Sequence, residues 1–256
     1  LFTHPLSYIM KISIITTTVR KGGLDLLAKC LNQQTFREFE HIVVTKNLDI
    51  WSKNFKTTYP LTIMWDPKKR EGDNNNLHKG WNHAIKEAKG ELIVSIVDLT
   101  WIPVNCLEKL WFAYQNDPKS CVTGIGHQYK EVINDKPEGL VWNDPRARTD
   151  QGTFYQVRPT EMELCVASFP KQGIQEIGGF DEIYDQGWAL GEKEAMYRME
   201  KAGYKMFIDQ TNEYRALYHD RLLGDNHEAQ YQKNSEIYLK HVQEIIDGQR
   251  LKVNYL

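Results

Sequence analysis

Short runs of β-branched and apolar residues alternate with stretches of helical spacing along the first part of the chain. The runs Ile12–Thr17, His41–Thr45, Leu61–Trp65 and Leu92–Val97 have the composition of β-strands. Between and after them, apolar residues recur every three or four positions, as in a helix that buries one face. This order predicts an α/β fold with an open, mostly parallel twisted sheet flanked by helices.

The second half of the chain has a less regular pattern. Residues 119–170 are rich in Gly, Pro and Asn, which predicts hairpins or a long loop. Further strands are expected at Glu163–Phe169 and Tyr204–Ile208. Helices are expected from the spacing of apolar residues at 24–31, 77–88, 105–115, 192–202 and 231–246. The last of these predicts a helix close to the C-terminus.

Composition argues against several classes of partner. The chain has 256 residues with 32 basic and 34 acidic side chains, so it lacks the basic excess that is typical of nucleic-acid binding. Its sequence has no apolar run that approaches the ~20 residues needed to cross a bilayer. The four cysteines, Cys30, Cys106, Cys121 and Cys165, contain no C-x-x-C pair. This spacing favours reduced thiols and a cytoplasmic location.

Four blocks of sequence, in the same order, resemble the family 2 glycosyltransferases, which have the GT-A fold. They are KISIITTTVRKGGLDLLAKCLNQQTFREFEHIVV (11–44), NNNLHKGWNHAIKEAKGELIVSIVD (74–98), IGGFDE (177–182) and GEKEAMYRMEKAGYK (191–205). The resemblance implies an enzyme that transfers a sugar from a nucleotide-diphosphate donor, usually with inversion. The acceptor would be a hydroxyl of a glycan, of a lipid-linked glycan or of another molecule.

The resemblance also implies how the chain is divided. We expect one fused domain with an N-terminal extension at 1–10, a nucleotide-sugar-binding half at 11–118, an acceptor-binding and catalytic half at 119–219, and a C-terminal helical segment at 220–256. Met10 opens the first strand region, which favours residues 1–9 as an upstream extension. The sequence leaves open whether the chain forms a homo-oligomer.

One acid, Asp98, stands where the family usually carries Asp-x-Asp at the end of its fourth strand. The resemblance makes Asp98 a candidate ligand for Mn²⁺ or Mg²⁺ bound with the donor diphosphate, and His219 a second candidate. Mg²⁺ commonly binds one or two carboxylates together with water and phosphate oxygens, so a single acid can suffice. In an extended strand, Thr100 would stand beside Asp98. Alternatively, Asp98 only caps the turn and His219 is structural.

The helix that begins near Glu192 resembles the acid-bearing helix of the family. If Arg198 aligns with the family's arginine, Glu192 takes the position of the catalytic base, and Gly191 replaces the acid that usually precedes it. Glu194 is the alternative base, and a third alternative is that both acids only stabilise the first helical turn. Trp188, just before the helix, is a candidate for binding the acceptor sugar or a core residue.

Several residues match family positions around the donor nucleotide. The candidate nucleotide-sugar contacts are Thr17, Arg20, Asn76, Lys79 and Asp98. Arg20 suits recognition of a phosphate or a stacked base, although a solvated loop position and, for Asn76, a helix cap are the alternatives. Where the family usually carries an acid after its second strand, this chain has Lys46. The resemblance therefore does not predict which nucleobase is bound.

Two other functions remain open at this point. A relative that binds a nucleotide sugar or a glycan without turnover would explain the missing acids. A nucleotidyltransferase would use the same type of sheet. The sequence contains no Gly-rich P-loop and no G-x-G-x-x-G, which argues against a kinase or a dehydrogenase.

Overall fold

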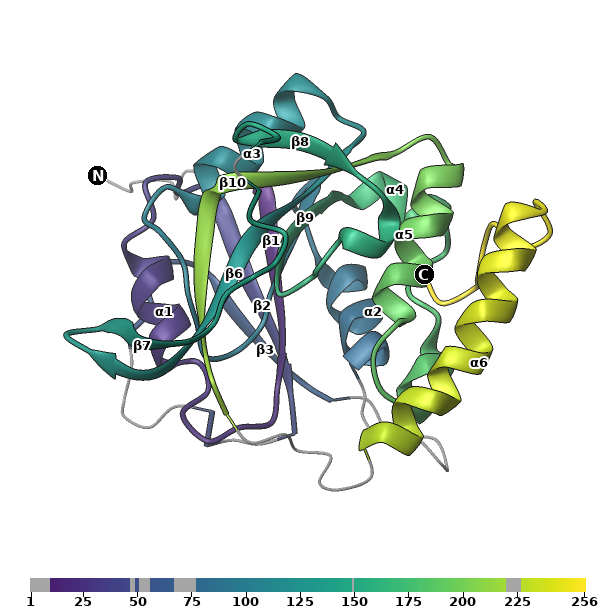
Figure 1. The fold of residues 1–256 in the computed structure, drawn as a ribbon. Coiled ribbons are helices and arrows are strands. Elements are labelled where there is room, and N and C mark those ends of the chain that lie inside the picture. The colour runs from purple at the N-terminus through teal and green to yellow at the C-terminus, as the bar shows by residue number, and fades with distance from the viewer. Residues whose placement is uncertain (1–9, 47–48, 51–55, 67–76, 149, 220–226) are drawn as a thin grey trace, which may run out of the picture.

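The predicted strands belong to one ten-stranded sheet (Figure 1). The computed structural model describes residues 10–46, 49–50, 56–66, 77–148, 150–219 and 227–256. The strands are β1 (Ile12–Thr18), β2 (Phe39–Thr45), β3 (Leu61–Trp65), β4 (Leu92–Ile96), β5 (Thr100–Trp101), β6 (Ser120–Ile133), β7 (Lys136–Trp142), β8 (Phe154–Val157), β9 (Val166–Pro170) and β10 (Lys205–Leu217). Neighbouring strands follow the order β3-β2-β1-β4-β9-β6-β10-β5, with β7 on β6 and β8 on β10.

The first half of the sheet is parallel and the second half is mixed. Strands β3, β2, β1 and β4 run in the same direction, whereas β9 is antiparallel to β4 and to β6. Strand β10 again runs parallel to β6. The predicted α/β class is confirmed. The carboxyl ends of β1, β2 and β4 lie at one edge of the sheet, which is the usual place for a ligand in such folds.

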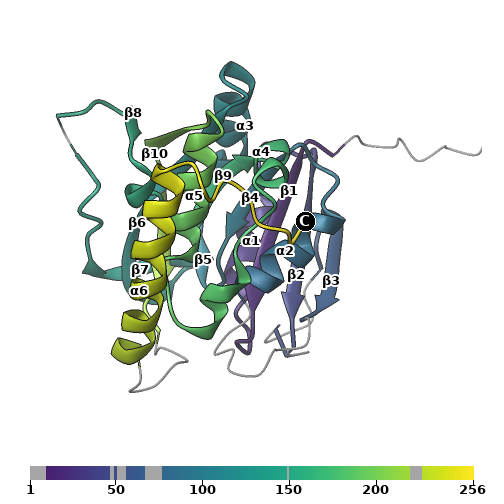
Figure 2. The same ribbon diagram turned by 90° about the vertical axis from the view of Figure 1, so that its right-hand side faces the viewer.

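Helices cover both faces of this sheet, and each face has its own apolar core (Figures 1 and 2). They are α1 (Asp25–Asn32), α2 (Leu77–Glu87), α3 (Cys106–Asn116), α4 (Lys171–Glu176), α5 (Gly191–Lys201) and α6 (His227–Ile246), with 3₁₀ turns η1 (Pro159–Glu161) and η2 (Glu182–Gln186). Ile14 packs with α1 and α3, and Ile15 packs with α2 and α5, because successive side chains of a strand point to opposite faces. Helix α6 packs against α5 and η2.

Strands β6 and β10 are the largest departure from expectation. Residues 119–170 were expected to form hairpins or a long loop, and β6 with β7 does form a hairpin, but β6 itself spans Ser120–Ile133. Its glycines look like strand breakers in the sequence. A Cβ at Gly126 would lie only 2.1 Å from the ring of Tyr214. The glycine therefore allows the long strand β10 to pack closely on β6.

The described part of the chain has neither a disulfide bond nor a helix that could cross a membrane. All four cysteines are free thiols. Every helix among the described residues is too short or too polar to span a bilayer. The expected extension at residues 1–9 lies outside the described residues.

Candidate active site

A cavity of about 210 Å³ opens between α2, α5 and the end of β4. Glu192 and Trp188 line it near the start of α5, His78 lines it from α2, and Val97 lines it from the chain after β4. The side chain of Glu192 is 14% exposed. The ring of Trp188 packs on His227, with the ring centroids 3.8 Å apart. The structure thus brings the predicted base and the predicted acceptor contact to one cavity.

Glu192 is the outer member of a buried row of charges formed with His78 and Asp185. The carboxylate of Asp185 accepts the backbone N–H groups of His78 and Lys79, both at 3.0 Å, at the start of α2, where a negative charge is favourable. The same carboxylate also accepts a hydrogen bond from Nδ1 of His78 at 2.9 Å. On its other side, Nε2 of His78 lies 3.9 Å from Oε2 of Glu192. His78 therefore lies between the two carboxylates, hydrogen-bonded to Asp185 and in a longer ion-pair contact with Glu192.

This row sets the charge states of its members. Burial alone would lower the pKa of His78, but Asp185 and Glu192 raise it to about 10. Burial would raise the pKa of Glu192, but the neighbouring His78 outweighs this effect and lowers the pKa below its ordinary value. At neutral pH, Glu192 is a carboxylate and His78 an imidazolium. The site therefore differs from a general base whose pKa is lifted toward neutrality.

Gly191 provides the space that His78 occupies. A Cβ at position 191 would lie 2.4 Å from Nε2 of His78 and 2.8 Å from Cβ of Tyr184. This contact gives a physical reason why no acid precedes Glu192.

We expect Gly191→Ala to lower the turnover of a nucleotide-sugar donor by roughly 10²-fold, the effect of a displacement of about 1 Å in a catalytic group. The acidic limb of the pH–rate profile should also move to higher pH, because the pKa of Glu192 is lowered only while His78 lies beside it. An unchanged acidic limb would contradict this account of Gly191.

His78 also predicts how the stability of the chain depends on pH. Its pKa rises from the ordinary value of 6.5 to about 10 in the fold, so the folded chain holds this proton more tightly than the unfolded chain. The resulting stabilisation is fully present below pH 6.5 and is lost as the pH rises through about 10. We expect the free energy of unfolding in urea to fall across this window, and to fall less in His78→Gln. Equal pH slopes for both proteins would count against the charged state of His78.

Glu194, the alternative base, is enclosed in the protein interior and paired with an arginine. It is fully buried, and Nη2 of Arg198 lies 2.7 Å from its Oε2. Arg198 also donates to the backbone carbonyls of Ile177 and Gly179, at 2.7 and 2.9 Å. Because Glu192 lines the cavity and Glu194 does not, the structure favours Glu192 as the base.

Asp98 is buried after β4, and its carboxylate is already paired. Oγ1 of Thr18 donates to Oδ2 at 2.5 Å, and Nη1 of Arg20 donates to Oδ1 and Oδ2 at 2.8 and 3.0 Å. Nη2 of Arg20 lies 3.3 Å from Nδ1 of His219. Arginine can only donate, so this nitrogen of His219 must accept. Arg20 thus lies between the two predicted metal ligands.

The turn after β4 aims the side chain of Asp98. Leu99 has a φ of 57°, in the left-handed region that side chains disfavour, so the chain is not extended here. The expectation that Thr100 stands beside the carboxylate is therefore wrong, and its hydroxyl donates to the backbone carbonyl of Asp98 at 3.2 Å. The carboxylate faces Arg20 and does not line the cavity of Glu192, although the preceding residue, Val97, does.

A divalent ion fits this arrangement poorly. An ion bound to Asp98 and to Nδ1 of His219 would need the space that the guanidinium of Arg20 occupies. If Arg20 stayed about 4 Å away, the +2 and +1 charges would repel by roughly 8 kcal/mol at an effective dielectric constant of about 20. Metal binding here requires Arg20 to leave Asp98.

A second group of acids lies where α5 meets α6 and the C-terminal segment. Ligand atoms of Asp181, Glu194 and His241 lie within 4.8 Å of one another. Arg250 contacts both carboxylates, and Arg198 also binds Glu194. The guanidinium groups already supply the positive charge that a cation would bring, so we regard this group as a structural ion cluster.

Of the remaining predicted donor contacts, Thr17 lies at the carboxyl end of β1. Oγ1 of Thr17 has no hydrogen-bond partner among the described residues, and Thr17 packs against Gly80, where a Cβ would lie 3.0 Å from its Cγ2. Lys79 is mostly buried. Asn76 lies outside the described residues. Thr17 therefore belongs to the contact of β1 with α2, Lys79 lies at the start of α2 beside Asp185, and Arg20 belongs to the cluster around Asp98.

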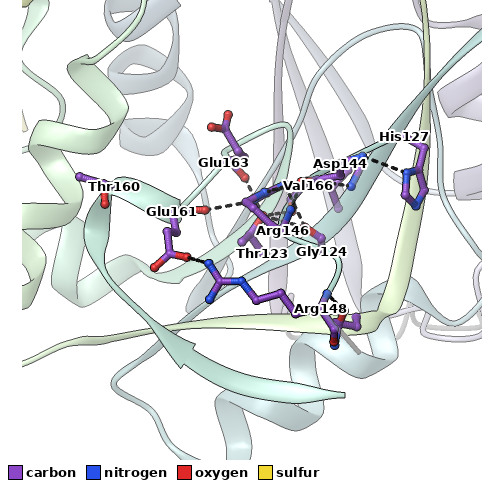
Figure 3. Close-up of polar contacts among 12 residues, drawn as sticks. Thr123, Gly124, His127, Asp144, Arg146, Arg148, Thr160, Glu161, Glu163 and Val166 are labelled. Carbon is purple, nitrogen blue, oxygen red and sulfur yellow. Dashed lines mark hydrogen bonds and ion pairs between the residues drawn. The ribbon is translucent and has the colours of Figure 1, made fainter. Parts of the chain in front are cut away.

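A second cavity, of about 310 Å³, lies beside the first, and Glu163 lines both. Arg146 also lines it and forms an ion pair with Asp144 (Figure 3). Burial would raise the pKa of Asp144, but Arg146 lowers it. Arg146 further donates to the backbone carbonyls of Glu161 and Gly124, at 3.0 and 3.4 Å. This network fixes the chain between β7 and β8 against β6 and η1.

The architecture is a GT-A-type α/β fold. It is similar to the structure of S. aureus TarS 1–349 in complex with UDP (TM-score 0.61, 14% identity over 93% of this chain) and to that of GalNAc-T7 with UDP, GalNAc and Mn²⁺ (TM-score 0.61, 16% identity over 83% of this chain). The chain spans 65% of the TarS chain and 44% of the GalNAc-T7 chain, less than two thirds of either. No protein family profile and no curated protein sequence matches the chain. At these identities the likeness establishes the fold alone, and membership in family 2 stays a prediction.

Two residues that contact the predicted base or its neighbour, His78 and Asp185, were not predicted from the sequence. His78 lies beside the predicted contact Lys79, but it reads there as one polar residue of an amphipathic helix. Asp185 is 107 positions away along the chain. The sequence offered one signal for this pair: His78 is a histidine near the start of a helix, and that helix was expected to lie at the ligand-binding edge of the sheet.

Proposed function

We propose that this chain is a glycosyltransferase that transfers a sugar from a nucleotide-diphosphate donor to an acceptor hydroxyl with inversion. The observation that carries the proposal is an ionised Glu192 in a cavity beside the end of β4. The GT-A-type fold supports it, because the TarS and GalNAc-T7 structures to which it is similar contain UDP. Trp188 in the same cavity supports an acceptor site, since an aromatic face can pack on the apolar side of a sugar ring.

Glu192 would act as the base of this reaction. The acceptor oxygen forms a bond to the anomeric carbon while the bond from that carbon to the diphosphate oxygen breaks, and the hydroxyl proton passes to the carboxylate of Glu192. The lowered pKa of Glu192 implies that the proton moves late, when the forming bond has made the hydroxyl acidic. His78, held by Asp185, keeps Glu192 ionised and in position.

The departing diphosphate needs positive charge around it. The sequence predicts a divalent ion, Mn²⁺ or Mg²⁺, on Asp98 and His219, and GalNAc-T7 contains Mn²⁺. Such an ion would polarise the diphosphate oxygens when bound. It would first have to displace Arg20 from Asp98, so the metal stays a prediction. Thr17, Arg20 and Lys79 are the proposed donor contacts among the described residues.

Release of a nucleoside diphosphate from a panel of UDP-, GDP-, CDP-, ADP- and TDP-sugars tests the proposal. We expect release from at least one donor above the rate in buffer. Binding of a donor without release would favour a non-catalytic relative. The replacement of the family's usual acids at positions 46, 100 and 191 is consistent with that alternative. Release of pyrophosphate from a nucleoside triphosphate and a sugar phosphate would favour a nucleotidyltransferase. The acceptor, the cytoplasmic location and homo-oligomer formation stay predictions.

A further inference from the structure

We propose that Arg20 takes the place of the divalent ion and stabilises the departing diphosphate. This inference rests on the proposed function. Arg20 follows β1, and its guanidinium binds both Asp98, which follows β4, and His219, which follows β10. The position that the resemblance assigns to a cation is therefore occupied by a positive side chain of the chain itself.

The surrounding residues fix this guanidinium in place. Nη1 of Arg20 bonds to both carboxylate oxygens of Asp98, and Thr18 holds the same carboxylate from β1. Gly23 packs on the cluster, because a Cβ there would lie 3.1 Å from Oδ2 of Asp98 and 3.2 Å from Cβ of Arg20. A positive group fixed before the reaction needs no rearrangement when charge develops on the leaving group.

Arg20 keeps donors available for a phosphate. A guanidinium has five N–H bonds. Those of Nη1 serve Asp98, and one of Nη2 serves His219. Among the described residues, none accepts from Nε or from the second N–H of Nη2. The side chain is 24% exposed, and two N–H bonds of one guanidinium match two phosphate oxygens.

Asp98 offsets part of the positive charge of Arg20. Two lysines at the same edge of the sheet add further positive charge. Lys21 follows β1 and Lys46 follows β2, and both are exposed. Lys46 stands where the family usually has an acid. Arg20 and these lysines therefore supply positive side chains at the edge that would face the diphosphate, where Asp49 and Asp66 also lie.

Calorimetric titration with UDP, GDP, CDP, ADP and TDP, first in EDTA and then in Mn²⁺, tests the inference. We expect at least one diphosphate to bind in EDTA with a Kd within about twofold of its value in Mn²⁺. Arg20→Ala should weaken that binding by about 10- to 100-fold, as for the loss of hydrogen bonds to a charged group, and leave binding of the parent nucleoside unchanged. Arg20→Lys should give an intermediate loss.

Two controls keep this test decisive. Arg158→Ala removes an arginine that is 82% exposed and should leave binding unchanged. Arg20→Ala with Asp98→Asn leaves no unpaired buried carboxylate, so it should fold even if the single variant does not, and it should show the same loss of diphosphate binding. Binding that requires Mn²⁺, or an Arg20→Ala variant that binds like the wild type in EDTA, would overturn this inference and leave the proposed function standing. A chain that binds no diphosphate in either condition would overturn both.

Discussion

Glu192→Gln is expected to lower the rate of nucleoside diphosphate release by about 10²- to 10⁴-fold, the usual contribution of a general base. The amide has nearly the same size as the carboxylate but cannot accept the acceptor's proton. Binding of the donor should be retained, because Glu192 is not among the proposed donor contacts. The initial rate of diphosphate release and the Kd of the diphosphate measure the two effects separately.

Glu200→Gln is the matched control, since Glu200 is an exposed acid on the same helix. It should leave both the rate and the Kd unchanged. A Glu192→Gln variant that turns over at a rate close to the wild type would remove Glu192 as the base. A variant that loses donor binding instead would assign Glu192 to the donor site.

Arg198→Met is expected to cause the largest loss of stability, about 3–5 kcal/mol in the free energy of unfolding, the typical cost of leaving a buried charge without its partner. Arg198 is 0% exposed and bonds to Glu194 and to two backbone carbonyls. Its removal leaves the carboxylate of Glu194 with Arg250 alone, at 3.3 Å. Urea unfolding, followed by circular dichroism, measures the change.

The double variant Glu194→Gln, Arg198→Met supplies the control for this prediction. It removes both charges of the pair, so its loss of stability should be smaller than the sum of the two single losses. Strict additivity, or a loss below about 1 kcal/mol for Arg198→Met, would show that this buried pair contributes little to the stability of the fold.

The parallel half of the fold could be predicted from the sequence because its elements carry their own periodicity. Strand β3 spans Leu61–Trp65 as expected, and α5 begins at Gly191, one residue before the expected start. Strands β6 and β10 could not be predicted to their full length, because the glycines in β6 are explained only by atoms of β10, the backbone carbonyl of Asn212 at Gly124 and the ring of Tyr214 at Gly126. Such a contact exists only after the two strands pair.

The site shows the same division between local and tertiary information. The place of Glu192 at the start of α5 could be predicted, because the spacing of a helix and the resemblance are both local features, whereas its role as the base stays a prediction. The charge state of His78 depends on Asp185, which η2 brings beside α2, and the charge state of Glu192 depends on His78. The pairing of Asp98 with Arg20 joins residues 78 positions apart. The sequence therefore indicated candidate site residues such as Asp98 and Arg20, but it did not show which of them form ion pairs with one another in the fold.

The anomeric configuration of the sugar released by donor hydrolysis tests the account most directly. Proton NMR of the products, recorded before mutarotation, identifies the anomer that forms when water takes the place of the acceptor. With an α-linked nucleotide sugar, an ionised Glu192 that activates the attacking oxygen predicts the β anomer, and Glu192→Gln should slow its formation by about 10²- to 10⁴-fold. Release of the α anomer, or no release of sugar from any donor, would contradict the account.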